Sequence, residues 1–313
     1  MNEKLPVIAA PMFLISDPTL VLAQCAAGVV GSLPSLNART PKVLDEWLCE
    51  LNEGVEKIAA TGVDRPTYAI NLIVHKSNAR LEEDLTLCIK HKVPKIITSL
   101  GANTEVYQAC KEHNIEVLHD VTTNAYAHKA IEKGATGLIA VCAGAGGHAG
   151  VQSPFALVRE IREWFQGPLA LSGAIATGEG ILAALALGAD YAYIGSAFIA
   201  TEEAKVSQAY KDSIVNSAAQ DIVYTDTFTG IPGNYLKDSI VQAGLDPTRL
   251  RPPEGVLDFS KVTTAKVWKD IWGSGQGIGT IHGVVSVDAL VRRWRDEFNH
   301  ALLRLSQFNR ECR

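Results

Sequence analysis

The sequence predicts a closed (β/α)8 barrel, with an appended helical and irregular segment at the C-terminus. Eight short apolar segments recur between residues 7 and 196, and their starts lie 21 to 38 residues apart, the length of one strand and one helix. The segments are nearly continuous in apolar character, as strands covered on both faces require. Amphipathic stretches separate them. Eight such units fit a closed barrel better than an open doubly wound sheet.

The predicted strands are rich in aliphatic residues and are bounded by Gly, Pro, Ser or Asn, which favour turns. They cover Val7–Met12, Val29–Pro34, Thr67–Val74, Lys95–Leu100, Glu116–Val121, Gly137–Cys142, Leu169–Ala174 and Tyr191–Ser196.

The intervals carry helix signals. Thr40 is a predicted N-cap because Pro41 suits the first helical position, and apolar residues from Leu44 to Ile58 then recur on one helical face. Similar stripes run through Leu81–Ile89, Val106–His113, Ala125–Ile131, Phe155–Phe165 and Gly180–Leu187.

The alternation stops after Thr201. Glu202–Ala219 is predicted to be a polar helix that leads into an irregular stretch, Tyr224–Pro253. Val287–Leu305 has a helical apolar stripe preceded by Ser286, a good N-cap residue. We therefore divide the chain into a barrel, residues 1–201, and a C-terminal lid and helical appendage, residues 202–313.

Composition excludes several classes of protein. The net charge is -5, and no dense basic run is present, so nucleic acid is not an expected partner. The six cysteines lack the close pairing of a metal site, and we predict no metal, a reduced state and a cytoplasmic location. The apolar runs are shorter than the about 20 residues that a membrane span needs, so no membrane association is expected.

The reactive groups of a barrel belong at the C-terminal ends of its strands. The sixth predicted strand is followed by a loop with four glycines and one imidazole, His148. Glycine lets backbone approach a ligand closely, and imidazole exchanges protons near neutral pH. We therefore predict that His148 is catalytic; the alternative is a solvated histidine in a flexible loop.

Two further strand ends carry glycine turns. Ser172-Gly173-Ala174 ends the seventh predicted strand, and Gly195-Ser196 ends the eighth. Backbone N–H groups at this position form the usual phosphate site of a barrel, although each glycine could equally serve a tight turn.

The first and third predicted strands end in residues suited to a flat ring. Ala9-Ala10-Pro11-Met12 offers small side chains and a thioether, and the Asn71 amide can donate and accept hydrogen bonds. A buried asparagine can equally serve only to form hydrogen bonds with backbone groups of the barrel.

Taken together, these motifs resemble the nitronate monooxygenase family, also known as the 2-nitropropane dioxygenases. The resemblance covers nearly the whole chain. It rests on Ala9-Ala10-Pro11-Met12, the Asn71 strand, Gly146-Gly147-His148-Ala149-Gly150, Ser172-Gly173-Ala174, Leu185–Asp190, Ile194–Phe198, Thr227–Gly230 and Gly273–Gly279.

The resemblance implies an FMN-containing barrel that oxidises alkyl nitronates, and neutral nitroalkanes as well, with molecular oxygen to a carbonyl compound and nitrite. His148 would act near the flavin. The residues implied to bind FMN are Ala9, Ala10, Pro11, Met12, Asn71, Gly147, Ser172, Gly173, Ala174, Gly195 and Ser196. The absence of a strand-to-helix GxGxxG pattern agrees with a mononucleotide.

The sequence departs from the family pattern at three places. His119-Asp120 stands where many relatives have His-Lys, so a lysine that could stabilise reduced flavin is missing. Ile231, Gly233 and Asn234 stand where relatives carry arginines, and Ala174 replaces a commoner glycine.

Two other functions stay open on the same scaffold. One is a flavin reductase, either an NAD(P)H:quinone reductase or a flavin-dependent enoyl-acyl-carrier-protein reductase. The other is a non-catalytic protein that binds FMN or a phosphosugar, in which His148 is only structural. A homodimer is the assembly that we leave open.

Overall fold

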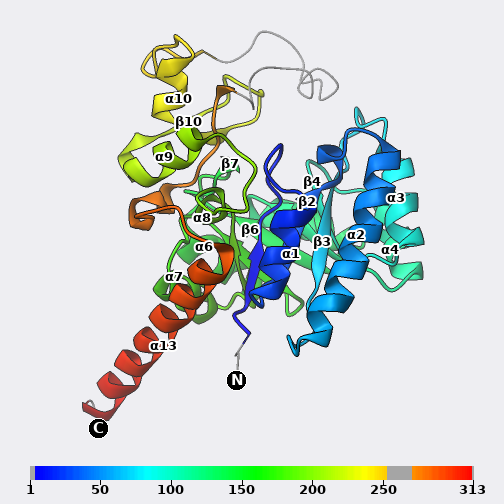
Figure 1. Ribbon diagram of the computed structural model, residues 1–313, viewed down its shortest axis with the longest axis horizontal. Coiled ribbons are helices and arrows are strands. Elements are labelled where there is room, and N and C mark those ends of the chain that lie inside the picture. Colours follow the sequence, from blue (N-terminus) through cyan, green and yellow to red (C-terminus); the bar gives the residue numbers. More distant parts are fainter. Residues whose placement is uncertain (1–3, 252–269, 312–313) are drawn as a thin grey trace.

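The computed structural model describes residues 4–251 and 270–311 and confirms the predicted barrel. Eight parallel strands form one sheet in the order β1-β9-β8-β6-β5-β4-β3-β2, with the eight predicted segments as its strands (Figure 1). They are β1 (Val7–Ala9), β2 (Gly31–Pro34), β3 (Tyr68–Ile73), β4 (Lys95–Ser99), β5 (Glu116–Val121), β6 (Gly137–Val141), β8 (Leu169–Ser172) and β9 (Tyr191–Ile194).

The first two strands close the barrel. The Ala9 N–H donates to the Val30 carbonyl at 2.8 Å, and the Val30 N–H donates to the Val7 carbonyl at 3.0 Å. On its other side β1 pairs in parallel with β9, so every strand has two neighbours.

Helices cover the outside of the barrel. Thr40 caps α2 as predicted, since its hydroxyl accepts from the Val43 N–H. The helices between the strands are α1 (Pro18–Ala26), α2 (Pro41–Ala60), α3 (Leu81–Lys90), α4 (Thr104–Glu112), α5 (Asn124–Glu132), α6 (Pro154–Arg162), α7 (Gly178–Leu187) and the short α8 (Ser196–Ile199), with a 3-10 turn η1 (Ser35–Asn37) after β2.

The interior of the barrel is packed with apolar side chains. Seven of the eight strands contribute buried residues to this inner cluster, two of them from β6, and Val30 just before β2 completes the ring. The contributors are Ile8, Ala69, Ile97, Leu118, Ile139, Val141, Ala170 and Tyr193. A filled interior means that a ligand can bind only beyond the strand ends.

The segment after Thr201 is more regular than predicted. The polar helix is shorter, α9 (Gln208–Asn216), and the stretch expected to be irregular holds β10 (Ile222–Thr225), β11 (Gly233–Leu236) and α10 (Lys237–Gln242). These two strands pair antiparallel, and β7 (Gly147–His148), from the loop after β6, joins β11 as a third strand. Neighbouring 3-10 turns are η2 (Ala219–Asp221) and η3 (Gln276–Thr280). Backbone pairing of β11 with the loop after β6 therefore orders this segment. The local sequence could not reveal that pairing.

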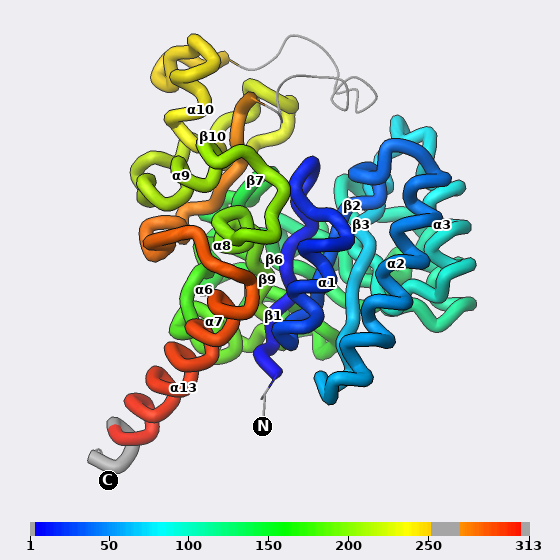
Figure 2. Tube along the Cα trace, viewed as in Figure 1, coloured from blue at the N-terminus to red at the C-terminus, as the bar shows by residue number. Residues whose placement is uncertain are grey.

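The last helix, α13 (Val287–Glu311), packs on α7 and α1 and extends beyond the barrel at its C-terminal end (Figure 2). Ser286 precedes it, and its hydroxyl accepts from the Ala289 N–H at 3.2 Å, as predicted. At Gly178 any Cβ would lie 2.2 Å from the Trp294 carbonyl oxygen, so only glycine permits this close approach. No helix within the described part of the chain has the length and apolar character to cross a bilayer.

Candidate active site

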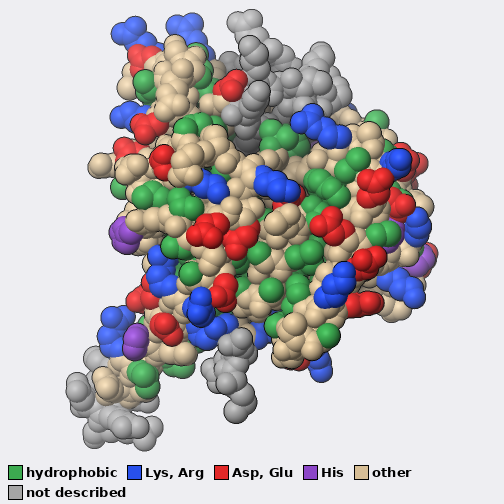
Figure 3. Space-filling view, viewed as in Figure 1, with side chains coloured by type: hydrophobic (Ala, Val, Ile, Leu, Met, Phe, Trp, Pro, Cys, Tyr) green, Lys and Arg blue, Asp and Glu red, His purple; other side chains and the backbone are tan. Residues whose placement is uncertain are grey.

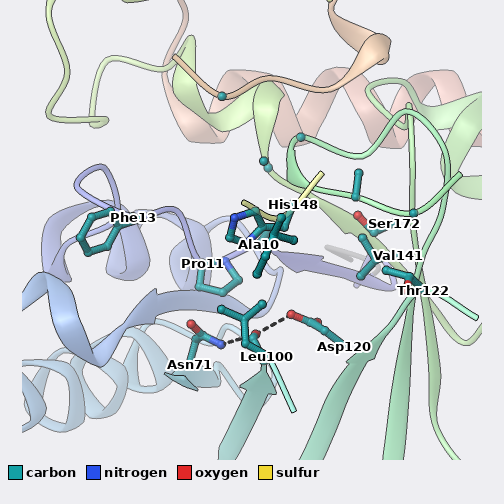
Figure 4. A pocket seen from close by; sticks show the side chains of 18 of the residues that line it. Ala10, Pro11, Phe13, Asn71, Leu100, Asp120, Thr122, Val141, His148 and Ser172 are labelled. Carbon is teal, nitrogen blue, oxygen red and sulfur yellow. Dashed lines mark hydrogen bonds between the residues drawn. The ribbon is translucent and has the colours of Figure 1, made fainter. Parts of the chain in front are cut away.

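A cavity of about 800 Å³ lies beyond the C-terminal strand ends and is mostly lined by apolar side chains (Figure 4). This volume is in the range of sites for small molecules and cofactors. Nine of the twelve residues proposed from the sequence line it: Ala10, Pro11, Met12, Asn71, Gly147, His148, Ser172, Gly195 and Ser196.

Three residues expected at the cofactor do not line the cavity. Ala9 is fully buried in β1, where it pairs with β9. Gly173 is also outside, and the Ala174 N–H, expected to bind phosphate, donates to the Gly144 carbonyl at 3.2 Å. The α7 N-terminus nearby is occupied too, because the Gly178 N–H donates to a Glu297 carboxylate oxygen at 2.7 Å. Of the two glycine turns predicted to bind phosphate, the one after β9 lines the cavity with both Gly195 and Ser196, whereas the one after β8 lines it with Ser172 alone.

His148 is held by the small sheet. It lies in β7, opposite Gly233 of β11, and its Nε2 is 3.0 Å from the Thr229 hydroxyl. That hydroxyl donates to the Ile231 carbonyl at 3.0 Å. Because Thr229 has one hydroxyl proton, the network assigns a proton to Nε2, which donates to Thr229. Nδ1 is then the basic nitrogen of the ring.

Burial lowers the pKa of His148 to about 4. The side chain keeps some exposed area because one side faces the cavity, yet the protein around the ring desolvates its charged form. The ring is therefore neutral at pH 7. Since the folded-state pKa is depressed, its contribution to stability is present above the unfolded value and is lost as pH falls toward 4.

The loop after β1 forms another wall of the cavity. Asn37, which the sequence interpretation missed, shapes it: the amide donates to the Met12 carbonyl at 3.0 Å and to the Ser16 carbonyl at 2.7 Å. Its Oδ1 accepts from Leu14, which has a φ of 62°. Its place three residues after the end of β2 is the local signal that could have found it.

Asn71 is oriented by its neighbours on β4. Its amide nitrogen donates to the Ile97 carbonyl at 3.2 Å and to the Ser99 hydroxyl at 2.8 Å. Both amide hydrogens are thus used within the barrel, and the contact of Asn71 with a ligand stays a prediction. The side-chain oxygen is the atom left to accept from a ligand.

Asp120 is a further ionisable group that lines the cavity. The Ser99 hydroxyl donates to its Oδ2 at 2.5 Å, and Figure 4 shows the continuous chain from Asn71 to Asp120. Burial raises the pKa of this carboxyl to about 7. Its position at the C-terminal end of β5 could have marked it as a site residue, but the sequence interpretation treated it only as the replacement of a lysine.

The C-terminal segment contributes the remaining wall. Ile231, Pro232 and Gly273 line the cavity, as the predicted lid requires. Asn234 does not; it is buried, and its amide donates to the Ala145 carbonyl at 2.7 Å, which anchors β11 to the glycine-rich loop. The Gly275 N–H donates to the Ser196 hydroxyl at 2.8 Å, so this segment also braces the turn after β9.

A closed barrel with a large cavity at the strand ends, a neutral imidazole and a desolvated carboxyl is a construction typical of enzymes that act on small organic molecules. Among the described residues, no cluster of three or more His, Cys, Asp or Glu is arranged to hold a metal ion.

Comparisons with known proteins agree with the predicted family. A family model described as nitronate monooxygenase matches residues 1–248. A nitronate monooxygenase from Paraburkholderia phytofirmans is 28% identical over 290 residues, covering 80% of this chain and 77% of that protein. The chain belongs to the nitronate monooxygenase family and is an oxidoreductase.

Two solved structures share the fold. FabK from Thermotoga maritima superposes with a TM-score of 0.77 at 24% identity, covering 97% of this chain and 95% of that one. Nitroalkane oxidase from Streptomyces ansochromogenes gives a TM-score of 0.79 at 21% identity, covering 96% and 97%.

Proposed function

We propose that this protein uses FMN to oxidise alkyl nitronates with molecular oxygen to a carbonyl compound and nitrite. The observation that carries the proposal is a neutral, desolvated His148 held at the wall of a cavity large enough for a flavin and a small substrate. Membership of the family supports it, and the nitroalkane oxidase with the same fold is consistent with it.

The residues present fit a flavin mononucleotide. Gly147 has a φ of 66°, and a Cβ there would meet nothing within 4 Å, so the glycine leaves cavity space that a side chain would fill. The Asn71 oxygen offers an acceptor for a ring N–H, and Pro11 and Met12 offer apolar contact. Gly195 and Ser196 would hold the phosphate. FMN, when bound, would supply the two-electron redox centre that the protein's own side chains lack.

The low basicity of His148 favours a substrate that needs no deprotonation. A base with a pKa of about 4 removes a proton from a neutral nitroalkane poorly at pH 7. A nitronate needs no such step, so the weak basicity of the imidazole does not slow its oxidation. We therefore propose nitronates as better substrates than the parent nitroalkanes, and proton removal by Nδ1 as the step that limits the latter.

The test is an anaerobic mixing experiment with the purified, flavin-loaded protein. Flavin released by heat should be identified as FMN by chromatography. A nitronate, added without oxygen, should bleach the flavin absorbance within seconds to minutes, whereas NADH and NADPH should not. Bleaching by a reduced nicotinamide alone would instead identify a flavin reductase, and recovery of FAD would contradict the cofactor assignment.

An acyl-carrier protein as the substrate carrier has less support. Such a partner is acidic and needs a basic surface. On the face drawn in Figure 3, Lys and Arg are interspersed with Asp and Glu and form no broad basic area. The cytoplasmic location and the homodimer stay predictions.

Ile231 should set substrate preference. Its side chain lines the cavity, so Ile231→Ala should enlarge the site and shift kcat/KM toward longer-chain nitronates, with flavin content unchanged. One methylene in an apolar pocket is worth roughly 10-fold to 200-fold in discrimination. Val241→Ala is the matched control, because Val241 is 54% exposed on α10 and does not line the cavity. Equal preferences in the two variants would show that Ile231 does not contact substrate.

A further inference from the structure

The proposed reaction leaves the carboxyl of Asp120 without a task. Asp120 lies in β5 and lines the same cavity as His148. Its Oδ2 accepts from Ser99, while its Oδ1 is buried and, among the described residues, has no hydrogen-bond partner. A buried carboxylate oxygen without a donor is costly, which favours the neutral acid.

The groups around Asp120 provide no compensating cation. Tyr193 from β9 and Tyr107 from α4 are the titratable neighbours that its charge affects, and both are phenols with raised pKa values. The adjacent His119 ring has its Nδ1 2.8 Å from the Thr98 hydroxyl and 3.1 Å from the Tyr107 hydroxyl, and burial lowers its pKa to about 4. Lys129 from α5 lines the cavity but is exposed, and no ion pair joins it to Asp120 in the part of the chain that the structure describes.

The chain of hydrogen bonds gives the proton a defined place. The Ser99 oxygen accepts from the Asn71 amide, so its own proton goes to ionised Asp120. When Asp120 takes up a proton, the acid O–H can donate back to the Ser99 oxygen, which has a second acceptor site. The Ser99 O–H then no longer donates to Asp120, and its hydrogen can point into the cavity, which Ser99 lines. Protonation of Asp120 thus converts Ser99 into a donor toward a ligand.

We propose that Asp120 and Ser99 form a proton-accepting pair that neutralises negative charge added to the cavity. This inference rests on the proposed flavin. When substrate transfers two electrons to it, one proton from solvent binds Asp120 at Oδ2, in addition to any proton that the flavin itself takes up. No covalent bond breaks in the protein. The pair would thereby do by proton uptake what a lysine does with a permanent charge.

The pair should be visible in the pH dependence of the flavin midpoint potential. Asp120 has a raised pKa of about 7, so it is neutral below that pH and ionised above it in the oxidised protein. Above about pH 7, reduction of the wild type should therefore take up one more proton than reduction of Asp120→Asn. One additional proton is a tenfold change in the equilibrium constant per pH unit, or about 30 mV per pH unit for a two-electron couple. Below pH 7 the two slopes should coincide.

Three variants complete the experiment. Asp120→Asn is close in shape to the neutral acid. Ser99→Ala removes a hydrogen-bond donor to the ionised Asp120 carboxylate and so raises the pKa of Asp120. The pH at which the slope changes should therefore be higher in this variant. Asp238→Asn, on the exposed surface of α10, should behave as wild type. The titration of the Asp120 carboxyl near pH 7, followed by infrared difference spectroscopy in the flavin-free protein, gives a second readout independent of the cofactor.

The outcomes separate the two ideas. A protein that binds no flavin contradicts the proposed function and, with it, the role of the pair in flavin reduction. Bound flavin with parallel slopes in wild type and Asp120→Asn at all pH values overturns the role of Asp120 alone. If the wild type shows no carboxyl titration near pH 7, or if that titration persists in Asp120→Asn, the proton-accepting pair itself is overturned.

Discussion

His148→Asn is expected to retain its flavin and to lose activity on neutral nitroalkanes by about 10²–10⁴-fold, the usual effect of removing a positioned acid–base group. Asparagine keeps a donor and an acceptor but cannot take up the α-proton. Preformed nitronates skip that step, so their kcat/KM should fall less. Steady-state kinetics with each nitroalkane and its nitronate, with flavin absorbance as the measure of cofactor content, compares the two losses.

Thr229→Val is the companion variant. It removes the hydroxyl that holds Nε2 while leaving the imidazole in place, so its loss on neutral nitroalkanes should be smaller than that of His148→Asn. Equal losses in His148→Asn would instead mean that His148 positions substrate and removes no proton. An unchanged rate would exclude His148 from the reaction.

The largest loss of stability is expected at Trp294. Its side chain is fully buried, contacts Phe198 edge-to-face at 5.3 Å between ring centroids, and donates from Nε1 to the Ala176 carbonyl at 2.8 Å. Trp294→Ala should lower the free energy of unfolding by about 3–5 kcal/mol, because it leaves a large cavity and an unpaired carbonyl where α13 meets the barrel. Urea denaturation of the flavin-free protein measures this change.

Two controls assign that loss to its causes. Trp294→Phe keeps a ring but removes the donor, so it should cost about 1–3 kcal/mol. Leu302→Ala, on the same helix but 50% exposed, should change stability by no more than about 0.5 kcal/mol. If Trp294→Ala is as stable as Leu302→Ala, α13 does not stabilise the barrel.

The sequence was sufficient for the barrel and for most of the cavity. Apolar runs such as Gly137–Val141 can satisfy their backbone and bury both faces only inside a parallel sheet, so their number and spacing determine the architecture. Once the strands are placed, the residues after them must converge, which is why Pro11, Asn71 and His148 could be named together.

Tertiary structure decided which atoms are available for chemistry. The Ala174 N–H and the Asn71 amide hydrogens have partners from other elements, Gly144 and Ser99, and no local pattern identifies such partners. The small sheet that holds His148 forms only because β11 pairs with β7 across more than eighty intervening residues. The pKa values of His148 and Asp120 depend on desolvation by the whole barrel end, a property of packing and not of residue order.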